Sequence, residues 1–198
     1  MQEITNELGG IWRAGGEIRN KISRVLIELP YIHRDMATAT TPYTSRILGL
    51  LGDKPFLGVL ESTPAKLQHH FERLGPQGLK KSYGPGKWTA GQIFCHLADA
   101  ELAMGFRTRQ IAAEPNHRIQ PFDENVWSRT YLQQDPATAV KACTALRAWN
   151  LSFWRTLTVA DFARMAFHPE RGEESLETVM KLLAGHDLNH LAQLEQIR

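Results

Sequence analysis

The chain has 198 residues, of which 42% are hydrophobic and 22% charged, a balance typical of one globular domain with or without an extension. Its 23 basic and 21 acidic residues give a formal net charge of +2, which argues against nucleic acid or a membrane as partner. There is no apolar run of roughly 20 residues, no secretory signal and, with two cysteines, no disulfide framework. We therefore expect a cytoplasmic protein.

Residues 1–50 differ from the rest of the chain. They contain two Gly-Gly pairs and a Thr-rich stretch, and they have no sustained helical period. Met36 could be an alternative translation start, in which case residues 1–35 would lie upstream of the native protein. The alternative is a genuine extension that packs on a neighbour.

Four helical patterns follow, and strand signals are weak because the alternating β-branched runs that a sheet needs are absent. We expect the helices at about residues 55–75, 89–114, 135–157 and 175–198. In the first, Thr63 suits an N-cap and Pro64 the first helical position, so the helix should kink or restart there. Gly75 followed by Pro76 should end it.

The second and third helices have clear start signals. Thr89 and Gln92 match a capping box, and Asp135 followed by Pro136 matches an N-cap with proline at the first helical position. The 20-residue connection 115–134 is too long for a hairpin turn, so it permits a long crossover and suits a functional role. Four amphipathic helices predict an all-α four-helix bundle.

The last helix contains the sequence GHDLNH, in which His186 and His190 stand four apart within an apolar stripe. Residues four apart lie about 5–6 Å apart on one helix face, so both imidazoles can bind one ion at about 2.0–2.1 Å. The alternative is that each histidine is a core residue satisfied by hydrogen bonds. The motif is close to the zincin motif, with Asp187 in place of glutamate, but only Glu195 follows as a third ligand, so we do not expect a zincin.

A third ligand should come from another helix, and His96 is the best candidate because it borders the apolar face of the second helix. Asp99, three residues further on, could accept a hydrogen bond from a ligand imidazole without binding the metal itself. The alternative for Asp99 is a solvated carboxylate. Asp187 points off the ligand face, and we expect it either behind the ligands or on the helix surface. His168 could line a pocket or belong to a structural turn.

Three segments resemble the DinB-like superfamily, which is distinct from the DNA polymerase that shares the name. They are KWTAGQIFCHLADAE, PFDENVWS and HPERGEESLETVMKLLAGHDLNHLAQLEQI. The resemblance covers about residues 42–198, so we expect the domain there and an N-terminal extension at 1–41. It implies a four-helix bundle of up-down-down-up topology, often a homodimer. It also implies a divalent-metal site with His96, His186 and His190 as ligands and open positions for water or substrate.

The loop and the second helix supply candidates for substrate contact. In PFDENVWS, Asp123 and Trp127 are four apart and could face the pocket together, the first as base or anchor and the second as an apolar wall. The alternative is a loop held by a capping aspartate and a buried tryptophan. Arg107 lies eleven residues beyond His96 on the same helix face and could attract a carboxylate; the alternative is a surface arginine.

Two hypotheses for function remain open. The first is a metal-dependent enzyme, either a hydrolase or an S-transferase that uses bacillithiol, mycothiol or glutathione as relatives do, acting on a small electrophile. The second is a non-catalytic protein that binds a metal or a small ligand in a stress response. The histidines suit zinc or nickel first, with iron or manganese also possible. A low-molecular-weight thiol is a possible second cofactor.

Overall fold

The computed structural model describes residues 41–198. The extension expected at 1–41 lies outside the described residues, apart from Thr41. The elements are α1 (Pro42–Leu51), α2 (Phe56–Gly78), α3 (Ala90–Ala113), α4 (Glu124–Trp127), a 3₁₀ segment η1 (Ser128–Gln133), α5 (Pro136–Trp154), α6 (Val159–Phe162), β1 (Met165–His168), β2 (Gly172–Ser175) and α7 (Leu176–Gln196).

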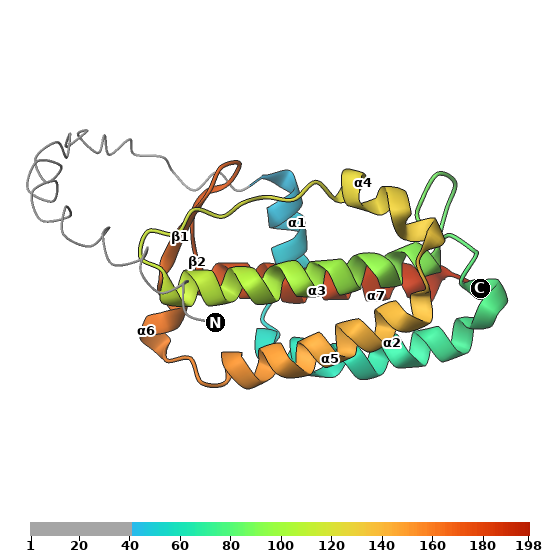
Figure 1. The fold of residues 1–198 in the computed structure, drawn as a ribbon, viewed down its shortest axis with the longest axis horizontal. Coiled ribbons are helices and arrows are strands. Elements are labelled where there is room, and N and C mark those ends of the chain that lie inside the picture. The colour runs from blue at the N-terminus through green and yellow to red at the C-terminus, as the bar shows by residue number, and fades with distance from the viewer. Residues whose placement is uncertain (1–40) are drawn as a thin grey trace, which may run out of the picture. The chain divides into compact units, whose positions relative to one another are not determined.

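The long helices α2, α3, α5 and α7 form a four-helix bundle (Figure 1). The colours in Figure 1 show that α3 and α5 run in one direction and α2 and α7 in the other, which is the expected up-down-down-up order. The crossover from α3 to α5 is the predicted long connection, and it contains α4 and η1. None of the helices within residues 41–198 combines the length and the apolar character needed to cross a bilayer.

The predicted helix starts are confirmed for α3 and α5. Thr89 Oγ1 accepts the N–H of Gln92 at 3.3 Å, and Gln92 Oε1 accepts the N–H of Thr89 at 3.0 Å. The Asp135 carboxylate accepts the N–H groups of Ala137 and Thr138 at the start of α5. Because these caps satisfy groups that the helix itself leaves unpaired, they can be recognised from a few neighbouring residues.

The prediction for α2 was wrong at Pro64 and right at Gly75. α2 begins at Phe56 and continues through Pro64, and Thr63 is a buried interior residue whose hydroxyl donates to Val59 O. A proline inside a helix leaves the carbonyl four residues earlier unpaired. Here that carbonyl belongs to Leu60, and it accepts a hydrogen bond from Arg147 Nη1 at 2.9 Å. The backbone leaves helical geometry only at Gly75, with φ 56°.

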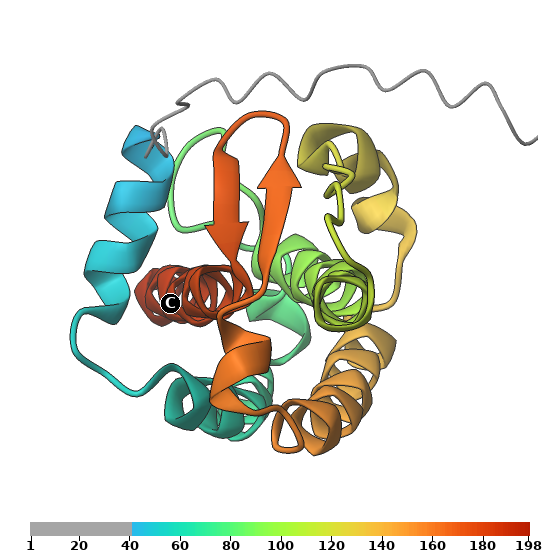
Figure 2. The same ribbon diagram turned by 90° about the vertical axis from the view of Figure 1, so that its left-hand side faces the viewer.

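Several short elements were not predicted, among them α1, α4, α6 and the two strands. Helix α1 lies in the region where we found no helical period; it spans only ten residues, capped by Thr41 and ended by Gly52 at φ 55°. Strands β1 and β2 form an antiparallel hairpin with Met165 opposite Ser175 and His168 opposite Gly172. Figure 2, viewed down the bundle, shows this hairpin standing between α1 and the α4 segment, over α3 and α7.

Helix α1 packs against α7 at a position that admits no side chain. An added Cβ on Gly185 would lie 2.2 Å from the carbonyl oxygen of Ile47 and 2.9 Å from its carbonyl carbon. Arg46 Nη1 donates to Asn189 Oδ1 at 2.8 Å one turn further along α7. Gly185 therefore sets how closely α1 approaches the helix that carries His186.

Candidate metal centre

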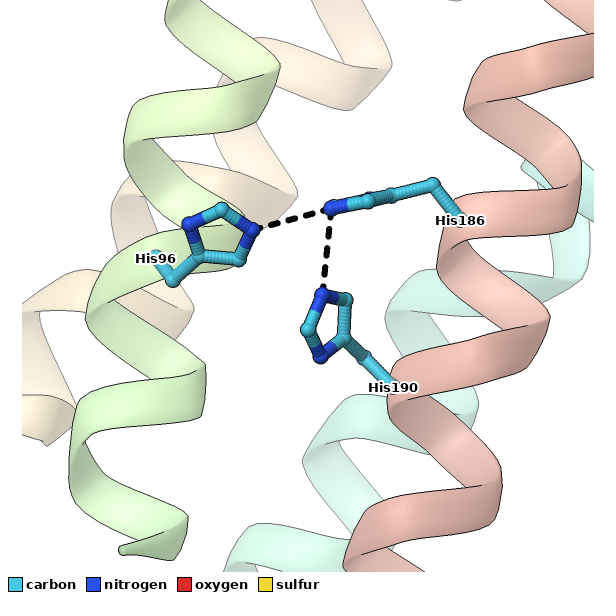
Figure 3. A group of neighbouring side chains, drawn as sticks. All are labelled: His96, His186 and His190. Carbon is cyan, nitrogen blue, oxygen red and sulfur yellow. Dashed lines mark hydrogen bonds between the residues drawn. The ribbon is translucent and has the colours of Figure 1, made fainter. Parts of the chain in front are cut away.

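The imidazoles of His96 on α3 and of His186 and His190 on α7 point at one another (Figure 3). Nε2 of His186 lies 2.9 Å from Nε2 of His96 and 3.1 Å from Nε2 of His190. One ring nitrogen from each residue lies within 4.8 Å of the others. The structure thus brings together the three histidines that the sequence selected.

The donor set fits a divalent cation. Nitrogens that share an ion at about 2.0–2.1 Å lie about 3 Å apart, and the two shortest nitrogen pairs here have that spacing. Nδ1 of His96 and Nδ1 of His186 are buried and have no hydrogen-bond partner within the described residues. The fit to a cation rests on the Nε2 atoms, because three that face one another compete for the same hydrogen bond, whereas a shared cation accepts a lone pair from each.

Burial keeps the three histidines neutral. It lowers the pKa of His96 to about 3, with the nearby His190 adding to the effect. It lowers the pKa of His190 to about 4 and that of His186 well below its ordinary value. A neutral imidazole has a free lone pair, so all three side chains are in the protonation state that metal binding requires at neutral pH.

Gln193 and Trp88 hold the cluster, and we did not predict either role. Gln193 Oε1 lies 2.8 Å from His190 Nδ1 and can only accept, so Nδ1 carries the proton and Nε2 presents its lone pair to the centre. Trp88 packs over His96 at 4.8 Å and over His190 at 6.5 Å between ring centroids. The i+3 spacing from His190 to Gln193 could have indicated the role of Gln193. No pattern in the sequence indicated the role of Trp88.

The two carboxylates expected behind the ligands lie elsewhere. Asp99 is half-buried and makes no hydrogen bond to a histidine in the described part of the chain. Its negative charge instead acts on Cys95, whose pKa is raised to about 11 by the burial of the thiol and by Asp99. Asp187 points off the ligand face as expected, but it is neither on the surface nor in contact with the ligands. It is 1% exposed and accepts from Arg147 Nη1 at 2.8 Å.

The Arg147–Asp187 pair belongs to a buried polar layer across the bundle. Arg147 Nε and Nη2 also donate to Glu101 Oε2 at 2.9 and 2.7 Å, and Asn150 Nδ2 donates to Glu101 Oε1 at 2.7 Å. Apolar clusters lie on both sides of this layer. The layer therefore fixes the mutual register of α3, α5 and α7, and with it the positions of the metal-ligand candidates.

A cavity of about 380 Å³ lies beside the histidines and is lined by His96 and His186. Arg107 also lines it, as its helical spacing from His96 indicated. Asp123 and Trp127 do not line it within the described structure. Their neighbours Phe122 and Glu124 do.

The loop prediction was wrong because the chain turns into α4 at Asp123. Its Oδ1 atom caps that helix by accepting the N–H groups of Asn125 and Val126, so the side chain is exposed and turned away from the cavity. Trp127 is 38% exposed and packs on Phe122, with 4.7 Å between ring centroids. A capping aspartate was one of our two alternatives for this loop; a buried tryptophan was not found.

The fold and the centre together define a class: an up-down-down-up helical bundle with three convergent histidines beside a cavity. The sequence profile of the DinB superfamily matches residues 60–194, and the chain belongs to this superfamily.

Comparisons with individual proteins support the assignment to this superfamily. The chain is 30% identical over 145 residues to "Putative metal-dependent hydrolase YfiT" of Bacillus subtilis, covering 72% of this chain and 82% of the relative. It is 29% identical over 143 residues to the similarly named OB0782 of Oceanobacillus iheyensis, covering 72% and 83%. The solved structure of YfiT, described as "a probable metal-dependent hydrolase with an unusual four-helix bundle topology", matches with a TM-score of 0.67 over 71% of this chain and 82% of that one.

Proposed function

We propose that this protein is a metal-dependent enzyme, a hydrolase in the first instance, that acts on a small molecule in the cavity beside His96 and His186. The observation that carries the proposal is the convergence of three neutral imidazoles, two of which, His96 and His186, line a cavity. The names of its relatives favour hydrolysis as the reaction class.

The residues have separate tasks in this proposal. His96, His186 and His190 hold the ion, with zinc or nickel as the first candidates and iron or manganese after them. Three ligands leave positions open, and the ion supplies Lewis acidity that activates a water or a thiol. Gln193 orients His190 by accepting a hydrogen bond from its Nδ1–H. Met104 and Leu183 give the cavity an apolar wall that limits the water near the ion.

A zincin-like mechanism does not suit this chain. In that mechanism the carboxylate next to the first histidine is the general base. Here Asp187 occupies that position, and its side chain is buried against Arg147, to one side of the face that carries the ligands. Within residues 41–198 no carboxylate hydrogen-bonds to the three histidines. Glu124 and Glu170, which line the cavity, are then the carboxylates of the described chain that could act as a general base.

A thiol-dependent S-transferase is the second candidate, and the observation that favours it is that no carboxylate within residues 41–198 hydrogen-bonds to the three histidines. A thiol bound to a divalent ion loses its proton without a carboxylate nearby. The apolar part of the lining, which includes Met104 and Leu183, suits an electrophile with an apolar body. The homodimer, the cytoplasmic location and a stress-related role stay predictions from the sequence.

The test is the metal content of protein purified without an affinity tag. We expect about one divalent ion per wild-type chain, its loss in His96→Ala, and its retention in His69→Ala, a matched control at an exposed histidine outside the cluster. No metal in the wild type after exposure to zinc and nickel would overturn the proposal. With metal bound, consumption of an electrophile that requires an added thiol would favour the transferase, and consumption without thiol would favour the hydrolase.

A further inference from the structure

Arg107 is a cation without an acidic partner at the cavity wall. Its Nη2 donates to Gln120 O at 3.2 Å and its Nη1 contacts Met104 Sδ at 3.3 Å, and no carboxylate pairs with it in the described part of the chain. Burial lowers the pKa of its guanidinium, and the nearby charge of Arg171 adds to this. A guanidinium has five N–H donors, so most of its hydrogen-bonding capacity is unused.

His168 offers a second free donor to the same cavity. It is 2% exposed, and its Nδ1 accepts the N–H of Glu170 at 3.2 Å. Nδ1 is therefore unprotonated in the neutral ring, and Nε2 carries the proton. Within residues 41–198 no group accepts that proton, although the side chain lines the cavity.

Arg171 is the third basic residue beside Arg107 and His168, and its charge is neutralised by an ion pair. It lines the cavity, and its charge lowers the pKa of both Arg107 and His168, so the three basic groups lie close together. Its guanidinium pairs with Glu174 through bonds of 2.9 and 2.6 Å, which neutralises it. Glu124 and Glu170 also line the cavity, but neither pairs with Arg107 in the described residues, so Arg107 keeps a charge without a carboxylate partner. A single negative charge on a ligand would match it.

This basic group and the histidines lie at opposite ends of one cavity. Arg107 is eleven residues beyond His96 on α3, a rise of about 16 Å. Between them the cavity is lined by apolar side chains on both helices. These are Ala100 and Met104 on α3 and Val179 and Leu183 on α7. Apolar side chains thus join the two polar ends along α3 and α7, while Tyr43, Thr44 and Glu124 line the cavity from α1 and α4.

We propose that Arg107 and His168 form a carboxylate subsite, and that the substrate or thiol of this protein is a small acid with an apolar body. Its carboxylate binds at Arg107 and His168, its body lies between α3 and α7, and its reacting group reaches the three histidines. The placement of the reacting group depends on the function proposed above; the carboxylate subsite does not.

The test compares acids with neutral molecules of the same length. The probes are mercaptohexanoate, mercaptooctanoate and mercaptoundecanoate, each paired with the corresponding mercapto alcohol, titrated by calorimetry into zinc-loaded protein. We expect one acid to bind about 10- to 100-fold more tightly than its alcohol, because a charge-assisted pair is lost in the alcohol. Arg107→Met should abolish this preference, and Arg107→Lys should retain part of it. Arg129→Met, at an exposed arginine away from the cavity, should leave it intact.

Other results would overturn the inference. Equal binding of acid and alcohol by wild-type protein would do so without any variant, and so would a preference that survives in Arg107→Met. Octanoate against octanol, titrated into metal-free protein, tests the carboxylate subsite independently of the histidines. Protein that takes up zinc but prefers neither octanoate nor mercaptooctanoate refutes the subsite alone. Protein that takes up no zinc but prefers octanoate refutes the proposed function and supports the subsite.

Discussion

Arg147 on α5 donates to the carbonyl of Leu60 on α2, the carbonyl that Pro64 leaves without its helical partner. The same guanidinium pairs with Glu101 on α3 and with Asp187 on α7. One side chain thus satisfies acceptors on the three other helices of the bundle. The proline that should have interrupted α2 is accommodated because a distant arginine completes the hydrogen bonding.

Replacing Arg147 should therefore damage the fold severely. Arg147→Met leaves the Asp187 carboxylate and the Leu60 carbonyl without partners and leaves Glu101 with Asn150 alone, and breaking a buried pair in this way costs about 3–5 kcal/mol. Arg155→Met is a matched control, because Arg155 pairs with Glu61 on the surface and such pairs contribute about 0–1 kcal/mol. The measurement is the free energy of unfolding in urea. Equal losses in the two variants would contradict the role assigned to Arg147.

Asp187→Asn separates the structural role of Asp187 from a catalytic one. The variant keeps an acceptor for Arg147, which also retains Glu101, so the loss of stability should be smaller than in Arg147→Met. Because Asp187 makes no contact with the ligand nitrogens, we expect the folded variant to bind one metal ion with unchanged affinity. Metal content and affinity would be measured well below the unfolding temperature. A loss of affinity above about tenfold would place Asp187 among the groups that support the ligands.

The features of this fold and site that could be predicted depend on interactions between residues close together in the sequence, whereas those that were missed depend on residues far apart or on competing local roles. The capping box at Thr89 and the spacing of His186 and His190 are local patterns, and both were recognised. Asp123 was misplaced because its local role as a helix cap competes with the pocket role that we gave it. The burial of Asp187 was missed because its partner Arg147 lies 40 residues away, and sequence spacing carries no information on that contact.

The close contact between α1 and α7 should be sensitive to a single methyl group. In Gly185→Ala the new Cβ would meet the backbone of Ile47, so α1 must move, which we expect to cost about 1–3 kcal/mol. Gly49→Ala on α1 is the control, because a Cβ there meets nothing within 4 Å and should stabilise the helix by roughly 0.5–1 kcal/mol. Thermal unfolding of both variants checks the prediction. A destabilised Gly49→Ala or a neutral Gly185→Ala would refute the assigned packing.

The stability of metal-free protein should fall steeply as the solution becomes acidic. The pKa values of His96 and His190 are lowered to about 3 and about 4 in the folded chain, whereas an unfolded histidine titrates at roughly 6.5. Between these values the unfolded chain binds more protons than the folded chain. The contribution is therefore fully present above about pH 6.5 and is lost as the pH falls toward 4.

Each of these two histidines should contribute a loss of about 1.4 kcal/mol between pH 7.5 and 5.5, and His186 acts in the same direction. Urea unfolding of chelator-treated protein at both pH values gives the total loss. His96→Gln removes one of the contributing groups and should reduce the loss by about 1.4 kcal/mol, whereas His69→Gln, at an exposed position, is the matched control. A pH dependence that is the same in wild type and in His96→Gln would mean that His96 is not held neutral by burial.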